Sequence, residues 1–137
     1  MKKELKMRKF KLKCKLCAVC CIYTEMEISN KEIKQIEKLG YSKIDFIDID
    51  RGYKYLKNIN GRCFFLTDNN KCKIYTNRPT GCRYYPIILN ENKCVIDRDC
   101  SCYIENQKIE IPNNICKKLK QYIRTLDEEI RNQIDNI

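Results

Sequence analysis

Cysteine placement constrains this chain more than any other feature. Seven of the eleven cysteines in its 137 residues form one ordered pattern. They are Cys14, Cys17, Cys20, Cys21, Cys63, Cys72 and Cys82. Four thiols within eight residues, followed by three that arrive singly, are typical of a metal or iron–sulfur site. The chain has no histidine, so we expect any such site to be built from cysteine, with a carboxylate or water as an additional ligand.

The adjacent pair Cys20 and Cys21 bears on the number of metal centres. Neighbouring side chains diverge on a helix or a strand, so two adjacent thiols are poorly placed to ligate one tetrahedral ion. Either they serve two sites, or one of them reaches a polynuclear centre; one ligand beside one buried thiol is the alternative. The spacing of Cys14, Cys17 and Cys20 resembles the start of a bacterial ferredoxin run, but the next cysteine follows at once. Only part of a zinc-ribbon pattern is present.

Composition favours a reduced compartment and gives a weak indication of a nucleic-acid partner. The basic residues 1–13 are followed by no apolar stretch of signal-peptide length, and no run of about 18 apolar residues predicts a membrane span. An odd number of cysteines leaves one thiol over in a fully paired framework. We expect a cytoplasmic metal-binding chain, with a disulfide-rich protein as the alternative. The net charge of +10 is compatible with nucleic-acid binding, but a solvated lysine-rich surface explains it better.

Two amphipathic helices are predicted. Ser29 and Glu32 form a capping box, an apolar stripe follows, and Gly40 supplies a stop, which predicts a helix at about 30–39. Apolar residues at steps of three and four predict a long C-terminal helix at about 113–135. We expect the long helix to pack onto the rest of the chain, with a partner-binding face as the alternative.

Short strands and cysteine-rich loops are expected between the two helices, with a strand or an ordered arm over residues 1–13. The expected elements are a strand at 53–59, a turn at Asn60-Gly61, a hairpin of 62–67 with 71–75, a short helix within 77–84 ended by Pro86, and a hairpin of 87–89 with 93–96. The first hairpin would carry Cys63 and Cys72 near its two arms. The pattern predicts an α+β fold in one domain over 1–137, with the motif core at about 12–102.

These ordered motifs resemble the YkgJ-type cysteine-cluster family, which is described as a zinc- or iron-chelating domain. Besides the seven cysteines, the resemblance is carried by Gly61, Leu66, Ile74, Tyr75, Arg78, Pro79, Arg83 and Pro86. A late cysteine after an acid is usual in the family, and Asp99-Cys100 fits it. The match covers about residues 12–102 and implies a metal or iron–sulfur protein.

The predicted ligand set has eight members. They are Cys14, Cys17, Cys20, Cys21, Cys63, Cys72, Cys82 and Cys100. Cys100-Ser101-Cys102 replaces the family's usual proline- and glycine-containing tail, so Cys94, Cys100 or Cys102 supplies the last ligand. Cys116 has no role in the family pattern, and we expect a buried thiol whose replacement by serine neither releases metal nor destabilises the fold.

Arg78 and Arg83 lie close to Cys82 in the sequence and are the candidate cofactor-binding residues. A buried four-thiolate site keeps negative charge, and arginine is a natural donor to such a centre. A surface position is the alternative for each arginine.

Three functions fit this pattern. The first is an iron–sulfur protein, with 4Fe–4S as one candidate cluster type. It would serve electron transfer, redox sensing or a larger enzyme, and would have a redox or enzyme partner protein. The second is a zinc-stabilised structural or interaction module without catalytic activity. The third is an enzyme with a reactive thiol, which without histidine needs a metal-bound or helix-activated thiolate. The absence of histidine favours iron–sulfur over catalytic zinc, and enzymatic activity stays open.

Overall fold

The α+β fold predicted from the sequence is confirmed. The computed structural model describes residues 21–100 and 102–135, so the strand or arm expected over 1–13 lies outside the described residues. In chain order the elements are α2 (Asn30–Lys38), α3 (Lys43–Phe46), β1 (Ile47–Asp50), β2 (Tyr53–Leu56), β3 (Asn58–Ile59), β4 (Arg62–Cys63), η2 (Tyr75–Asn77), α4 (Thr80–Tyr84), β5 (Ile87–Asn90), β6 (Lys93–Ile96), α5 (Tyr103–Asn106) and α6 (Asn113–Asp135). None of the helices in the described ranges is long and apolar enough to cross a membrane.

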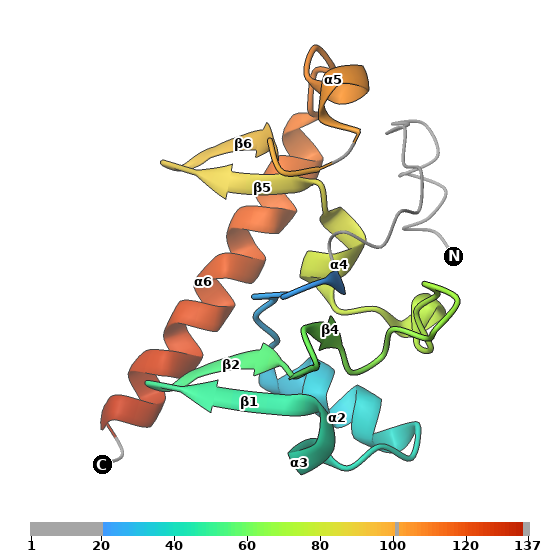
Figure 1. Ribbon diagram of the computed structural model, residues 1–137. Helices are drawn as coiled ribbons and strands as arrows, with labels where there is room; N and C mark the ends of the chain where they lie inside the picture. The colour runs from blue at the N-terminus through green and yellow to red at the C-terminus, as the bar shows by residue number, and fades with distance from the viewer. Residues whose placement is uncertain (1–20, 101, 136–137) are drawn as a thin grey trace.

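The described residues form two hydrophobic clusters, and one long helix runs past both of them. The first core consists of Ile28, Ile33, Ile36, Phe46, Ile47, Leu56, Cys63, Phe65 and Ile74. The second core consists of Ile87, Ile96, Ile115 and Leu119, the last two from the start of α6. Figure 1 shows α6 running past the β5–β6 hairpin near one end and the β1–β2 hairpin near the other. The long helix therefore connects the two clusters.

Both predicted amphipathic helices are present. The capping box forms as expected at the start of α2, because Ser29 Oγ accepts from the Glu32 N–H at 3.3 Å and Glu32 Oε1 accepts from the Ser29 N–H at 3.2 Å. The chain leaves α2 through Gly40 with φ of +105°, a left-handed conformation that glycine adopts without strain. The long helix α6 occupies the predicted range.

Three antiparallel hairpins form two-stranded sheets: β1–β2, β3–β4 and β5–β6. Their two-residue turns are Arg51-Gly52, Asn60-Gly61 and Glu91-Asn92, all with positive φ at both positions. This is the turn geometry whose twist matches the twist of paired strands. The Asn60-Gly61 turn and the second predicted hairpin are thus confirmed.

The hairpin predicted between 62–67 and 71–75 is wrong in its extent. Arg62 and Cys63 pair backwards with Ile59 and Asn58, so their backbone groups serve the β3–β4 ladder instead. The two predicted arms, 62–67 and 71–75, are instead joined by a single β-bridge, between Leu66 and Cys72. Cys63 and Cys72 still flank one compact turn, in which the Lys73 N–H donates to Phe65 O at 2.7 Å.

A disulfide joins Cys94 on β6 to Cys116 on α6, with a Cα–Cα distance of 5.8 Å. The expectation that Cys116 is a buried thiol is therefore wrong. The reason lies in the packing of the second core, where Ile96 of β6 meets Ile115 and Leu119 of α6. This packing places the strand against the first turns of the helix. No local spacing in the sequence indicates this pairing.

We now expect Cys116→Ser to lower the free energy of unfolding by about 3 kcal/mol, because the disulfide links residues 22 positions apart and restricts the unfolded chain. Urea unfolding of the variant and the wild type measures the difference. Metal content by elemental analysis is expected to stay the same. Equal stability of the two proteins would contradict the structural role of the bond.

Candidate metal centre

Four of the eight predicted ligands lie at the first core. Cys63 is a buried member of that cluster, and Cys21, Cys72 and Cys82 are partly buried and pack against it. They come from four separate segments: the chain before the Ile22–Arg62 bridge, strand β4, the turn after Leu66, and helix α4. Residues distant in the sequence thus bring thiols to one hydrophobic cluster.

Among the other four predicted ligands, the structure describes Cys100. Cys14, Cys17 and Cys20 are outside the described residues. Cys100 lies in the loop between β6 and α5, where its Sγ accepts from the Cys102 N–H at 3.4 Å. Within residues 21–100 and 102–135, no three cysteine, aspartate or glutamate side chains are close enough to hold one metal ion. The complete ligand set therefore stays a prediction.

The segment that follows Cys21 is held against the β3–β4 hairpin. Asn58 makes two hydrogen bonds with the Thr24 backbone: its Oδ1 accepts from the N–H at 3.1 Å, and its Nδ2 donates to the carbonyl at 2.9 Å. The Tyr23 N–H donates to Gly61 O at 2.6 Å. Asn58 also pairs with Cys63 across the β3–β4 ladder. The same residue therefore positions the chain near Cys21 and at Cys63.

Two features favour glycine at position 61. Its φ is +79°, and a Cβ atom there would lie 2.8 Å from Cζ of the Tyr23 ring. Any larger residue would strain the turn and push the tyrosine away. The family glycine thus allows close approach of two segments that carry cysteines.

Helix α4 presents Cys82 and is anchored through its first residue. The Thr80 N–H and the Thr80 Oγ1 both donate to Glu32 Oε2, at 2.5 Å and 2.8 Å. The carboxylate of Glu32 therefore satisfies a backbone donor at the start of α4, two residues before the thiol.

The same carboxylate accepts from two further elements. Its Oε1 receives the Ser29 Oγ–H at 2.9 Å and the Tyr122 Oη–H at 2.5 Å, in addition to the Ser29 N–H. We call Glu32, Ser29, Thr80 and Tyr122 the Glu32 network. It joins α2, α4 and α6 around a side chain that is only 8% exposed. Hydrogen bonds to a buried carboxylate are among the stronger ones in proteins.

Burial and neighbouring negative charge both affect the pKa of Tyr122 in this network. Burial, followed by the adjacent Glu32 carboxylate and then the Cys82 thiol, raises the pKa of the Tyr122 phenol well above its ordinary value. The phenol is therefore a stable hydrogen-bond donor to Glu32 at neutral pH. The contribution of Cys82 also locates this thiol near the network.

A buried ion pair fixes the other half of α6. Lys54 of β2, 4% exposed, donates to Glu129 Oε1 at 2.7 Å and also to Asn30 Oδ1. The Asn30 N–H donates to the same Glu129 oxygen at 2.8 Å. Helix α6 is thus attached at two points, through Tyr122 to Glu32 and through Glu129 to Lys54 and Asn30. The second attachment helps to keep Tyr122 in place.

The two candidate cofactor-binding arginines are placed differently. Arg78 is partly buried, lies over the Tyr75 ring with 3.9 Å between Cζ and the ring centroid, and donates through Nε to Tyr75 O at 2.9 Å. Arg83 is exposed and donates to Thr80 Oγ1 at 3.2 Å. Arg83 therefore contacts the Glu32 network through Thr80. The cofactor-binding role of both residues stays a prediction.

Sequence reasoning missed most of the Glu32 network. The capping-box pattern predicted the contact between Ser29 and Glu32. It does not predict the hydrogen bonds that the Glu32 carboxylate accepts from Thr80 and Tyr122. Nothing local connects Glu32 to Thr80 or to Tyr122, which lie 48 and 90 residues away. Lys54 also gave no signal, because a lysine within a strand is ordinarily a surface residue.

Comparison with known proteins agrees with the cysteine pattern. Residues 13–121 match the family model CxxCxxCC, described as a "Putative zinc- or iron-chelating domain". The chain is 34% identical over 82 residues to a curated protein of Methanocaldococcus jannaschii, named "Uncharacterized protein MJ0661". That match covers 53% of this chain and 43% of the relative, so it spans less than half of the relative's length. No solved structure matches the chain.

Glu32→Gln should lower the free energy of unfolding by about 2 kcal/mol or more, because an amide has one acceptor oxygen and would leave donors of the network unsatisfied. Glu37→Gln, at an exposed position of the same helix, should change stability by less than about 0.5 kcal/mol. Urea unfolding of both variants measures the contrast. Similar values for the two would show that the carboxylate is not important for stability.

The raised pKa of Tyr122 predicts a loss of stability at high pH. Its contribution is complete below the unfolded-state pKa of about 10 and falls as pH rises, because the unfolded chain ionises first. The slope reaches at most ~1.4 kcal/mol per pH unit. Unfolding measured between about pH 9.5 and 11 should show a smaller slope for Tyr122→Phe than for the wild type. Parallel slopes would contradict the assignment.

Proposed function

The chain belongs to the CxxCxxCC family of zinc- or iron-chelating domains, and from this premise we propose that it carries an all-cysteine iron–sulfur cluster or clusters. The ligands we propose are Cys14, Cys17, Cys20, Cys21, Cys63, Cys72, Cys82 and Cys100. Such a cluster would supply one-electron redox chemistry.

The observation that carries this proposal is the gathering of Cys21, Cys63, Cys72 and Cys82 at one hydrophobic core in a chain without histidine. Thiolates are the usual ligands of iron–sulfur clusters, whereas catalytic zinc commonly uses histidine. The donor chemistry at this core thus fits the cluster that we propose. The full family motif provides the further thiols that a cluster needs.

The first core also limits access of water. Phe65 is 1% exposed and packs edge-to-face against Tyr41, with 5.0 Å between ring centroids, and against Phe64 at 5.1 Å. These rings directly follow Cys63 in the chain or pack on that segment. A hydrophobic surrounding of this kind influences the potential of a redox centre and protects it from hydrolysis.

We propose electron transfer, redox sensing or service to a larger enzyme as the role, with a redox or enzyme partner protein. The curated relative is longer than the matched segment, which favours a module that works beside further protein. Cytoplasmic location belongs to the same proposal, since thiolate ligands persist best in a reducing compartment.

A zinc-stabilised interaction module is the second candidate. The strands of the described chain are only two to four residues long, and each sheet has two strands. Isolated two-stranded hairpins are marginally stable, so such a fold gains much from a structural metal. Zinc held by four of the thiols would meet this need without redox chemistry.

Anaerobic purification followed by a visible spectrum and analysis for iron, zinc and acid-labile sulfide separates the candidates. Iron with matching sulfide supports the cluster. Stoichiometric zinc without sulfide would replace it with the interaction module. A protein that holds neither metal would overturn both.

Cys63→Ser and Cys17→Ser should each release metal and destabilise the fold, because each removes a proposed ligand. Cys116→Ser is the matched control: it removes a disulfide sulfur and should cost stability while metal is retained. Metal-to-protein ratios measured after desalting give the comparison. Full metal content in Cys17→Ser would contradict the ligand assignment.

A further inference from the structure

A cleft of about 810 Å³ lies beside the β5–β6 hairpin, on the second-core side of the molecule. Its walls come from β5 and β6, the residues 97–99, Tyr103, the segment 107–111 and the first turns of α6. Both half-cystines of the Cys94–Cys116 disulfide are among the lining residues, and each is partly exposed. A small molecule or an extended chain in the cleft would therefore lie against the two residues of the disulfide.

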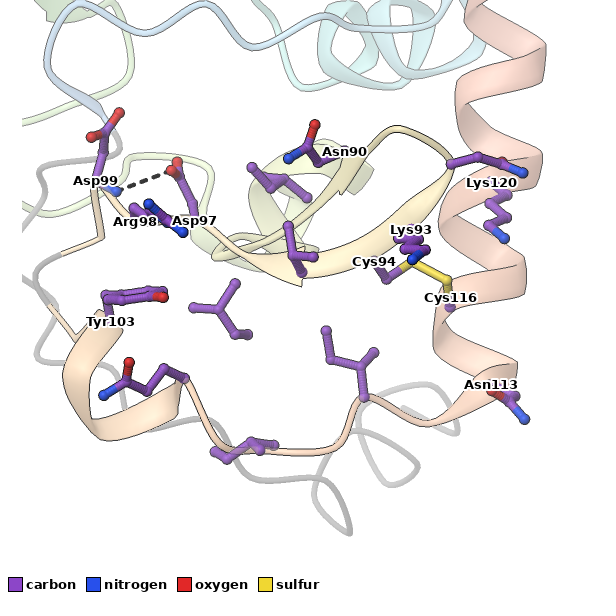
Figure 2. Close-up of a pocket in the computed structure, with 17 residues that line it drawn as sticks. Asn90, Lys93, Cys94, Asp97, Arg98, Asp99, Tyr103, Asn113, Cys116 and Lys120 are labelled. Atoms are coloured by element: carbon purple, nitrogen blue, oxygen red, sulfur yellow. Dashed lines mark hydrogen bonds between the residues drawn. A yellow bond between two sulfur atoms is a disulfide. The ribbon is translucent and has the colours of Figure 1, made fainter.

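Two lysines lie close to the disulfide in the sequence and line the same cleft. Lys93 precedes Cys94 on β6, and Lys120 lies one helical turn after Cys116 on α6; both line the cleft. Figure 2 shows them at the same end of the cleft as the disulfide, whereas Asp97, Arg98 and Asp99 lie at the opposite end. The acidic groups are thus separated from the sulfurs.

The position of Cys116 on α6 suits it to be the leaving group. It is the fourth residue of α6, within the first turn, where the positive end of the helix dipole stabilises a thiolate. Lys120 on the same helix face adds to this effect. Lower basicity of the departing sulfur accelerates thiol–disulfide exchange.

We propose that the cleft is a thiol–disulfide exchange site at which a dithiol reductant opens the Cys94–Cys116 bond. A thiolate of the reductant attacks Cys94 Sγ; a new S–S bond forms, and the Cys94–Cys116 bond breaks with release of the Cys116 thiolate. The second thiol of the reductant then attacks its own mixed-disulfide sulfur and releases Cys94. The dithiol becomes a disulfide, and the protein gains two electrons and two protons.

Reduction would loosen β6 from α6. Among the described residues, the second core has four buried side chains, Ile87, Ile96, Ile115 and Leu119, and the disulfide is a covalent link between its strand and its helix. The chain leaves β6 directly towards Cys100. The redox state of this pair can therefore affect a loop that carries a proposed ligand, although the exchange itself does not depend on bound metal.

The test uses the full chain as purified, with dithiothreitol as the dithiol and timed alkylation of thiols. Trypsin should leave Cys94 in the peptide 94–98 and Cys116 in 109–117, so the disulfide appears as one linked peptide of known mass. We expect the linked peptide to disappear while circular dichroism still reports a folded protein. Persistence of the linked peptide until urea unfolds the chain would overturn the proposal, as would alkylation of both cysteines before any reductant is added.

Two charge variants test the role of the cleft. Lys120→Glu should slow reduction about threefold, because it raises the basicity of the leaving thiolate. Lys120→Gln should slow reduction less than Lys120→Glu does. It serves as the test variant if the charge reversal in Lys120→Glu prevents folding. Lys34→Glu, the same change at an exposed site on α2, is the control and should leave the rate unchanged. Equal rates for the Lys120 variants and the control would overturn the electrostatic assignment of the site.

Discussion

The hydrogen bonds of the Glu32 carboxylate are the interactions on which the arrangement of α2, α4 and α6 depends. The carboxylate caps α2 through Ser29, receives the first residue of α4, and accepts the Tyr122 hydroxyl of α6. A buried charge is costly unless each of its lone pairs has a donor, and here every approaching element brings one. Because Thr80 precedes Cys82 by two residues, the position of a proposed ligand follows from the same contacts. The hydrogen bonds that compensate the buried Glu32 carboxylate thus also position Cys82.

The thiols at the first core depend on backbone geometry as much as on side-chain packing. Cys63 lies in a two-residue strand that exists because Asn60-Gly61 reverses the chain, and Cys21 lies nearby because Gly61 lets Tyr23 approach. Neither contact needs a large hydrophobic core. Cysteines in small folds are commonly positioned by turns of this sort, and the bound metal then contributes much of the stability.

The sequence predicted what is local and failed where contacts are distant. The capping box at Ser29, the Asn60-Gly61 turn and the periodicity of α6 all act within a few residues, so their signals were sufficient. The extended 62–67 hairpin was wrong because β3 competed for the same backbone groups. The Cys94–Cys116 disulfide and the Tyr122 contact depend on how α6 packs, which no short pattern encodes. For the ligand set, motif spacing predicted eight thiols; four of them lie at the first core, and the ligand set itself stays a prediction.

On the two proposals above, the division into two hydrophobic clusters would give the protein two points of chemical control. One cluster gathers thiols suited to metal, and the other is closed by a covalent sulfur bond. Chelation and reduction would therefore act on opposite halves of the same small chain. Helix α6 contacts both halves, through Tyr122 and Glu129 on one side and Ile115 and Leu119 on the other, so a disturbance at one end would be expected to affect the other. On the proposed function, a single helix makes this protein respond jointly to metal supply and to the thiol balance of its surroundings.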